Sequence, residues 1–116
     1  MVVARGEVWW VELGDPVGSS PGFRRPAVIR QSDSFNRSAI STVVAVMLTS
    51  SMRLLDAPGN TLVTRRMSGL PKDSVANVSQ LVTLDRDAVK EKAGRLPLVV
   101  MQRVDAGLRL VFDLER

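Results

Sequence analysis

The stretch "STVVAVMLTS" at residues 41–50 decides how this chain folds. Its centre, residues 43–48, is a continuous apolar and largely β-branched run, without the alternation of a half-exposed strand. It is also far too short to cross a bilayer, which takes about 20 apolar residues in a helix. We therefore expect a strand at the centre of a sheet, and no membrane segment.

Further strands are expected on both sides of this one along the chain. They share β-branched or aromatic content and turn signals at their ends: 7–13, 25–31, 60–64 and 74–84. The proline in the second of them has to start the strand or lie on an edge, because proline cannot donate to a ladder. Trp9 and Trp10 should face opposite sides of their strand, so at least one of them is expected in the core.

The remaining segments suggest helix or turn. Residues 85–94 combine Asp85 as a cap, helix-forming residues and Gly94 as a stop, which predicts a short helix. Residues 96–112 have apolar side chains at helical spacing and predict a C-terminal amphipathic helix, which Gly107 weakens by about 1 kcal/mol relative to Ala. Residues 32–38 should form a turn or one helical turn. The class is mainly β with α additions, arranged as a small bent barrel.

The composition excludes several kinds of chemistry. The 116 residues, enough for one domain, include no cysteine, histidine or tyrosine. A disulfide framework and a zinc enzyme are therefore excluded, and no cofactor is expected. Any catalysis has to use Arg, Lys, Asp, Glu, Ser or Thr. The N-terminus lacks the apolar core of a signal peptide, so we expect a cytoplasmic protein.

Positive charge is concentrated in the middle of the chain. The formal net charge is +4, and residues 24–66 alone hold seven arginines against two aspartates. Thirteen of the sixteen basic side chains are arginine, the planar fork suited to phosphates and base edges. An anionic partner is one interpretation, and a merely solvated basic surface is the other.

The loop "GDPVGSSPGFRRP" at residues 14–26 is unusually long for a link between two strands. Its glycines, prolines and serines favour turns, and it ends in two arginines followed by a proline. In a small barrel such a loop should project over one mouth of the sheet as a flap. The final arginine is then held on a rigid strand.

Several segments together resemble the MazF/PemK family, the toxins of bacterial toxin–antitoxin pairs. They occur in order over nearly the whole chain: "RGEVWWVEL", "GS" at 18–19, "RRPAVI", Asn36, "VVAVMLTS" and "DSVANVSQLVTLD". The resemblance implies one toxin domain over 1–116 with an SH3-like small β-barrel of the CcdB/PemK kind and a C-terminal helix. It also implies a homodimeric, metal-independent endoribonuclease that cuts single-stranded RNA to a 2′,3′-cyclic phosphate and a 5′-hydroxyl. The implied inhibitor is an acidic, MazE-like cognate antitoxin.

Matched to the family's pattern, Arg25 is the catalytic arginine and Thr49 is its partner. The chemistry is consistent with this, because RNA cleavage by its own 2′-hydroxyl needs no enzyme nucleophile. It needs charge stabilisation at the phosphorane, which a guanidinium and a hydroxyl can supply. Arginine as a proton shuttle is a secondary hypothesis, since a neutral guanidine is rare at neutral pH. Taken alone, Arg25 suits a surface ion pair and Thr49 a strand end.

The residues expected to contact RNA are Ser19, Ser20, Arg24, Gln31, Asn36, Arg53 and Gln80. Asn36 and Gln80 match family positions and carry amides that can read base edges, whereas Gln31 suits a structural role at a strand end equally well. Arg24 and Arg53 are assigned to phosphate attraction. The chain departs from the family at Ser20, Pro21 and Ser79, where acidic or amide residues are usual, so an altered sequence preference is expected.

Two rival functions use the same features. One is a basic barrel that binds RNA without cutting it, and the other is a gyrase-poisoning toxin of the related CcdB fold. Arg25 together with Thr49 discriminates between them, because the gyrase poisons do not depend on that pair.

Overall fold

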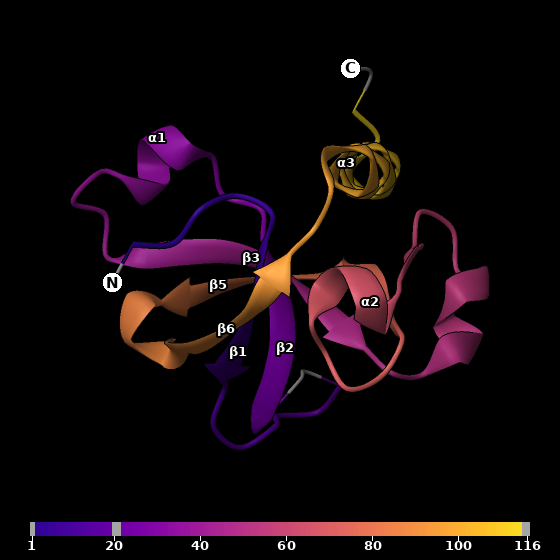
Figure 1. Cartoon of the computed structure of the whole chain (residues 1–116), viewed down its shortest axis with the longest axis horizontal. Coiled ribbons are helices and arrows are strands. Elements are labelled where there is room, and N and C mark those ends of the chain that lie inside the picture. The colour runs from indigo at the N-terminus through magenta and orange to yellow at the C-terminus, as the bar shows by residue number, and fades with distance from the viewer. Residues whose placement is uncertain (1, 20–21, 115–116) are drawn as a thin grey trace.

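The computed structural model describes residues 2–19 and 22–114, and within them six strands form one antiparallel sheet (Figure 1). The order across the sheet is β4-β5-β3-β2-β1-β6. The strands are β1 Glu7–Glu12, β2 Arg24–Ile29, β3 Thr42–Thr49, β4 Thr61–Val63, β5 Ser74–Asp85 and β6 Val89–Arg95. The helices are α1 Asp33–Asn36, α2 Arg65–Ser68 and α3 Leu98–Phe112, with 3-10 turns η1 Met52–Asp56 and η2 Arg86–Ala88. The predicted class, mainly β with a C-terminal helix, is confirmed.

The strand expected at the centre of the sheet lies there. β3 pairs with β2 on one side and β5 on the other, and its residues from Val43 to Leu48 are buried except Val44, which is half-buried. Because the sheet curls into a half-barrel, both of its faces cover apolar cores. A continuous apolar run is the sequence signature of such a doubly covered strand.

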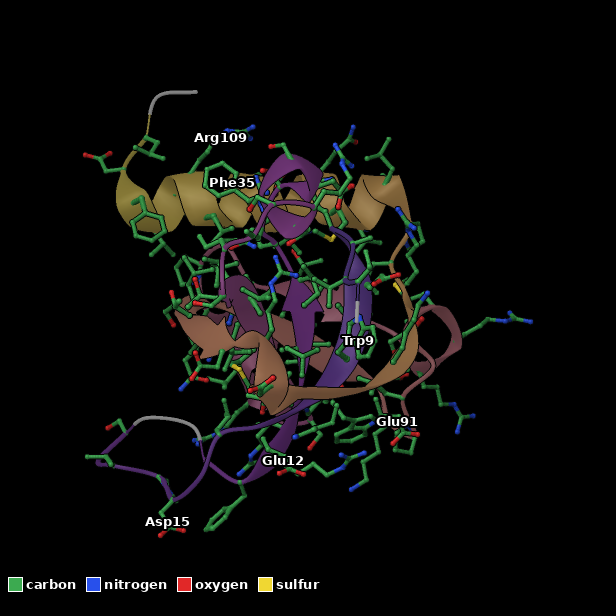
Figure 2. All side chains as sticks on the ribbon, turned by 90° about the vertical axis from the view of Figure 1, so that its left-hand side faces the viewer. Trp9, Glu12, Asp15, Phe35, Glu91 and Arg109 are labelled. Carbon is green, nitrogen blue, oxygen red and sulfur yellow. The ribbon has the colours of Figure 1, made fainter. Side chains whose placement is uncertain are left out.

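The two cores follow the alternation of the strands. Val8, Val28 and Val46 lie in register across three strands and pack into the core beneath α3. Their neighbours along the strands, among them Trp9, pack into the other core. Trp9 is only 8% exposed, which confirms that one tryptophan anchors the interior (Figure 2).

The helix α3 covers one face of the sheet, at the end of the molecule away from the loop between β1 and β2 (Figures 1 and 2). Gly107, which lowers its intrinsic helicity, is the residue at which the helix touches the turn before β4. A Cβ added at Gly107 would lie 2.1 Å from the carbonyl oxygen of Gly59. The glycine therefore permits a close backbone approach. Within the described residues, no helix is both long and apolar enough to span a membrane.

The helix predicted over residues 85–94 is wrong. Only residues 86–88 form a helical turn, η2, and the following residues are β6, which pairs with β1. Without β6, the apolar strand β1 would be a free sheet edge, and pairing buries Val89 completely. Gly94 is needed where this strand passes α2, since a Cβ there would lie 2.4 Å from the Ser68 carbonyl oxygen. Tertiary pairing overrides the weak local helix propensity.

Candidate functional site

Arg25 on β2 and Thr49 on β3 come together at the end of their strands. The pairing of the two strands ends with Ala27 opposite Met47, and Arg25 and Thr49 are each two residues beyond that pair. Both residues line the same two hollows of the surface. The predicted catalytic pair therefore shares one place in the fold, built from two strands that are distant in sequence.

Arg25 and Thr49 both line two adjacent hollows. The first, of about 300 Å³, lies beneath the loop between β1 and β2, and we call it the flap hollow; Ser19, Phe23, Asn77 and Gln80 also line it. The second, of about 230 Å³, we call the tryptophan hollow; Trp10, Arg24, Leu70 and Lys72 also line it. A flexible polyanion crossing Arg25 and Thr49 would have space on both sides of the pair.

The flap is closed at its base by backbone hydrogen bonds. Phe23 N–H donates to the Gly14 carbonyl at 2.6 Å, and Leu13 N–H donates to the Phe23 carbonyl at 2.9 Å. Gly22 packs so tightly that a Cβ there would lie 2.5 Å from the nitrogen of Pro16. The carbonyl of Gly22 in turn accepts from Arg25 Nε at 3.1 Å. The base of the loop therefore orients the guanidinium.

The rest of the Arg25 guanidinium is uncommitted. Its side chain is exposed, it forms no ion pair with any described residue, and only Nε donates within that part of the chain. The four N–H groups on its terminal nitrogens are left to bind a ligand. The surface ion pair that was the alternative for Arg25 is therefore not found among the described residues.

Arg24 behaves differently from its neighbour. Its Nη2 lies 2.6 Å from Glu91 Oε1, and its guanidinium carbon lies 5.1 Å from the centroid of the Trp10 ring. Arg24 lines the tryptophan hollow, and Glu91 reaches it from β6, which lies on the far side of β1. Glu91 offsets part of its charge, so Arg24 attracts phosphate less strongly than a free arginine would.

A bulge in β5 shapes the far wall of the flap hollow. Val46 of β3 lies opposite Leu81, but the next residue, Met47, lies opposite Asn77 instead of Gln80, so residues 78–80 are extra. Bulges bend a strand and re-aim its side chains. Here Asn77 and Gln80 line the same hollow as Arg25. Gln80, which the sequence predicted as a base-reading amide, therefore lies in the flap hollow. The sequence did not predict that Asn77 lines it as well.

Gln31 and Asn36 are not at this site. Gln31 Nε2 donates to Asn36 Oδ1 at 3.0 Å and to the Thr42 carbonyl at 3.1 Å. Asn36 Nδ2 donates to the Gln31 carbonyl at 3.0 Å and to Asp33 Oδ1 at 3.2 Å. Both residues are buried, and their amides join α1 to the strands. These internal partners favour a structural role for both residues, and a contact of either one with RNA stays a prediction.

Arg86 and Asp33 complete this cluster, which we call the α1 network: Gln31, Asp33, Asn36 and Arg86. Arg86 Nε donates to the Ile40 carbonyl at 2.7 Å, and its Nη2 donates to the Asn36 carbonyl at 2.9 Å. The backbone N–H of Arg5, 2.8 Å from Asp33 Oδ1, and the Asn36 amide lower the pKa of Asp33. The side chains of the α1 network therefore hydrogen-bond to other groups of the same chain, which is typical of a structural role.

The other predicted contacts are distributed around the flap. Ser19 lines the flap hollow, while Ser20 lies outside the described residues, as does Pro21. Arg53 is exposed on η1, and its Nε lies 3.4 Å from Ser51 Oγ. No three His, Cys, Asp or Glu side chains gather as possible metal ligands within residues 2–19 and 22–114.

Phe23 is a second residue that the sequence did not single out. It has a left-handed backbone with φ of 61°, yet it is not glycine, and its ring is 58% exposed. Such a backbone costs an ordinary residue about 1–2 kcal/mol. It lines the flap hollow beside Arg25. Strain that holds an aromatic ring in solvent at a polar cleft is typical of ligand sites.

Comparison with known proteins shows which family this chain resembles. Residues 4–112 match the family model described as PemK-like, MazF-like toxin of type II toxin–antitoxin system. Endoribonuclease MazF6 of Mycobacterium tuberculosis is 43% identical over 98% of this chain and 100% of its own length. Endoribonuclease EndoA of Bacillus subtilis is 30% identical over 98% and 97%. These relatives confirm the predicted enzyme class.

Solved structures agree on the fold. MazF from Deinococcus radiodurans superposes with a TM-score of 0.82 at 21% identity, covering 98% of this chain and 99% of that one. A mycobacterial endoribonuclease in complex with its cognate antitoxin gives a TM-score of 0.78 at 23% identity, covering 98% of each chain. The chain therefore belongs to the family of PemK-like, MazF-like toxins of type II toxin–antitoxin systems.

Proposed function

We propose that this chain cuts single-stranded RNA by directing the RNA's own 2′-hydroxyl at the adjacent phosphate, without a metal. The products are a 2′,3′-cyclic phosphate and a free 5′-hydroxyl. The single observation that carries the proposal is the exposed guanidinium of Arg25, which shares the lining of two hollows with Thr49 and has no ion pair with any described residue. Membership of a family with relatives named endoribonucleases supports it.

In this mechanism, Arg25 and Thr49 stabilise charge. As the 2′-oxygen attacks, the phosphate becomes a dianionic phosphorane, and the N–H groups of Arg25 and the hydroxyl of Thr49 donate to its oxygens. The 2′-hydroxyl gives up a proton, and the leaving 5′-oxygen takes one up. Water can serve as both partners, because a guanidinium keeps its proton at neutral pH and is a poor base.

Residues around the pair bind the strand. Ser19 and Gln80 line the flap hollow and are suited to contact bases or sugars there. Arg24 and Arg53 supply charge along the path, and their removal should weaken binding in a salt-dependent way without altering the preferred sequence. The strand is single because only unpaired bases can turn into such hollows.

The partner that we propose as inhibitor is an acidic antitoxin. One fold neighbour was solved with its cognate antitoxin, and the segment 24–66 of this chain has a surplus of five positive charges. An acidic disordered tail that folds on this surface would cover Arg25 and block RNA. Released from it, the toxin would act on cytoplasmic RNA and arrest growth.

A homodimer is part of the proposal. Large apolar side chains at the end of α3, Leu110, Val111 and Phe112, are exposed in the single chain. Covering them with a second copy would remove this surface from water, which is favourable by about 25 cal/mol per Å². Light scattering of the purified protein tests this, with a monomeric mass as the contradicting result.

The activity is tested with purified protein, a long single-stranded RNA and excess EDTA, followed by analysis of the cut ends. We expect discrete cuts, cyclic phosphate ends and 5′-hydroxyl ends. RNA that is bound but uncut would favour a non-catalytic RNA-binding module. Intact, unbound RNA together with inhibition of gyrase would favour the gyrase-poisoning alternative.

A further inference from the structure

Asn77 is the most enclosed polar side chain of the flap hollow. It is 8% exposed and lies on β5 opposite Met47, at the step where the bulge begins. A buried amide normally has partners for both its oxygen and its nitrogen. Asn77 has partners for only one of them among the described residues.

The orientation of this amide follows from a chain of hydrogen bonds that starts at the backbone. Val78 N–H can only donate, and it donates to Asn60 Oδ1 at 3.0 Å. Asn60 Nδ2 is therefore the donor to the Leu54 carbonyl at 2.9 Å and to Asn77 at 3.3 Å. The Asn77 atom that receives it has to be Oδ1.

A second donor reinforces this orientation. The hydroxyl of Ser79, inside the bulge, donates to the same Oδ1 of Asn77 at 2.9 Å. Both acceptor sites of the oxygen are used, and Nδ2 is turned the other way. A flipped amide would set two N–H groups against the Asn60 amide nitrogen, so the orientation is specified by sterics and charge.

The Nδ2 group remains open. It makes no hydrogen bond within the part of the chain that the structure describes. The side-chain atoms there that are both sealed from solvent and without a hydrogen bond are Arg30 Nε and Asp105 Oδ1, which face each other as an ion pair. Asn77 Nδ2 is not among them, so a molecule in the hollow can reach it. The hollow thus presents a donor of fixed orientation that has no acceptor among the described residues.

We propose that Asn77 selects the base in the flap hollow by donating from Nδ2 to a carbonyl oxygen on the base edge. Uracil and guanine carry a carbonyl where cytosine and adenine carry an amino group. An amino group would set donor against donor in an enclosed place, where an unmet donor is costly. The site therefore prefers a keto base over an amino base next to the cut. This inference rests on the proposed ribonuclease function.

The size of the preference follows from the value of one such contact. Leaving one buried donor without an acceptor costs about 1–3 kcal/mol, which corresponds to roughly 5- to 150-fold between bases. Because the oxygen of Asn77 is already occupied, the amide cannot turn over to accept from an amino base. That restriction separates Asn77 from Gln80, which is less buried in the same hollow.

The test is cleavage of a randomised single-stranded RNA pool, with sequencing of the new ends. For the wild type we expect an enrichment of uracil or guanine of about fivefold or more at one position flanking the cut. In Asn77→Asp an acceptor replaces the donor, so cytosine or adenine should become preferred at that same position. The preference is a ratio within one reaction, so the added negative charge can slow cutting without imitating this result.

Ser79→Ala provides a second variant that adds no charge. It removes one of the two donors that fix the amide, and the keto preference should fall severalfold while cutting continues. Thr83→Ala, an exposed change further along β5, is the matched control and should keep the wild-type pattern. Circular dichroism verifies that each variant is folded.

Unchanged preference in both Asn77→Asp and Ser79→Ala would overturn the inference, as would a wild type that cuts without a keto preference. If Asn77→Asp does not fold, Ser79→Ala alone decides. A wild type that cuts no RNA would overturn the proposed function itself, which is a different result from cutting with the wrong preference.

Discussion

The flap hollow and the α1 network are both polar places at the ends of the same sheet, and they use their side chains in opposite ways. Asn36 and Asn77 are both at least nine-tenths buried. The Asn36 amide donates to the Gln31 carbonyl and to Asp33, whereas Asn77 Nδ2 and the terminal nitrogens of Arg25 have no partner among residues 2–19 and 22–114. Unused hydrogen-bonding capacity, more than burial or residue type, distinguishes a binding site from a structural cluster.

The largest effects should come from replacing one arginine by alanine in the flap hollow and one in the α1 network. Arg25→Ala removes the phosphorane clamp and should lower kcat by about 10²–10³-fold or more, with little change in stability because the side chain is exposed. Arg86→Ala removes the hydrogen bonds to the carbonyls of Ile40 and Asn36 and should lower stability by about 0.5–1.5 kcal/mol while cutting continues. Single-turnover cleavage and urea unfolding measure the two effects. Equal loss of cleavage in both variants would contradict the distinction.

Asn36→Ala tests the structural side of the comparison. The change removes the hydrogen bonds that Asn36 makes with the Gln31 amide and with Asp33. This loss should lower the free energy of unfolding by about 1–3 kcal/mol. The base preference measured with a randomised RNA pool should stay that of the wild type. An altered preference in a folded Asn36→Ala protein would assign this residue to the RNA site.

Phe23→Gly sharpens the comparison at the flap. Glycine accepts a φ of 61° without cost, so the variant should gain up to about 1 kcal/mol of stability. Loss of an exposed ring that can stack on a base should weaken binding of single-stranded RNA by about 1–3 kcal/mol. Thermal unfolding and fluorescence anisotropy report the two changes. Weaker folding with unchanged RNA affinity would show that the ring serves packing instead.

The smallest effect concerns acid stability, which the α1 network should carry. Hydrogen bonds from the backbone N–H of Arg5 and from Asn36 lower the pKa of Asp33 below its ordinary value of 3.8. The folded pKa is thus below the unfolded one, so the stabilisation is present above pH 3.8 and is lost as the pH falls through the folded value. The stability advantage of the wild type over Asp33→Asn should shrink between pH 6 and pH 3. A constant difference in urea unfolding would contradict it.

Much of the fold could be predicted because its main signals are local. The apolar run at 43–48 identified the central strand, and helical spacing identified α3. Residues 85–94 could not be predicted in this way, because the free edge of β1 that recruits β6 is a distant part of the chain. Gly107 likewise reads as a weak point until its contact with Gly59 is seen.

The candidate site likewise contains residues that the local sequence could predict and residues that depend on distant parts of the chain. Arg25 lies near the start of β2 and Thr49 is the last residue of β3. Both strands have clear sequence signals, so the resemblance could place both residues. Asn77 depends on a bulge and on a bond to Asn60, neither of which has a local signal. Its one trace in the sequence is a polar residue between Ala76 and Val78 in an otherwise apolar run. The sequence also could not show that the amides of Gln31 and Asn36 bind each other.

The central claim is that the protein supplies charge stabilisation and the RNA supplies the nucleophile. The most direct measurement uses one RNA oligonucleotide containing a mapped cut site, made with and without a single 2′-deoxy nucleotide immediately 5′ of the cut bond. We predict that the substitution abolishes cutting at that bond while the oligonucleotide still binds with nearly unchanged affinity. Cutting of the deoxy-substituted bond would require a nucleophile from the protein or from water, and would contradict the account.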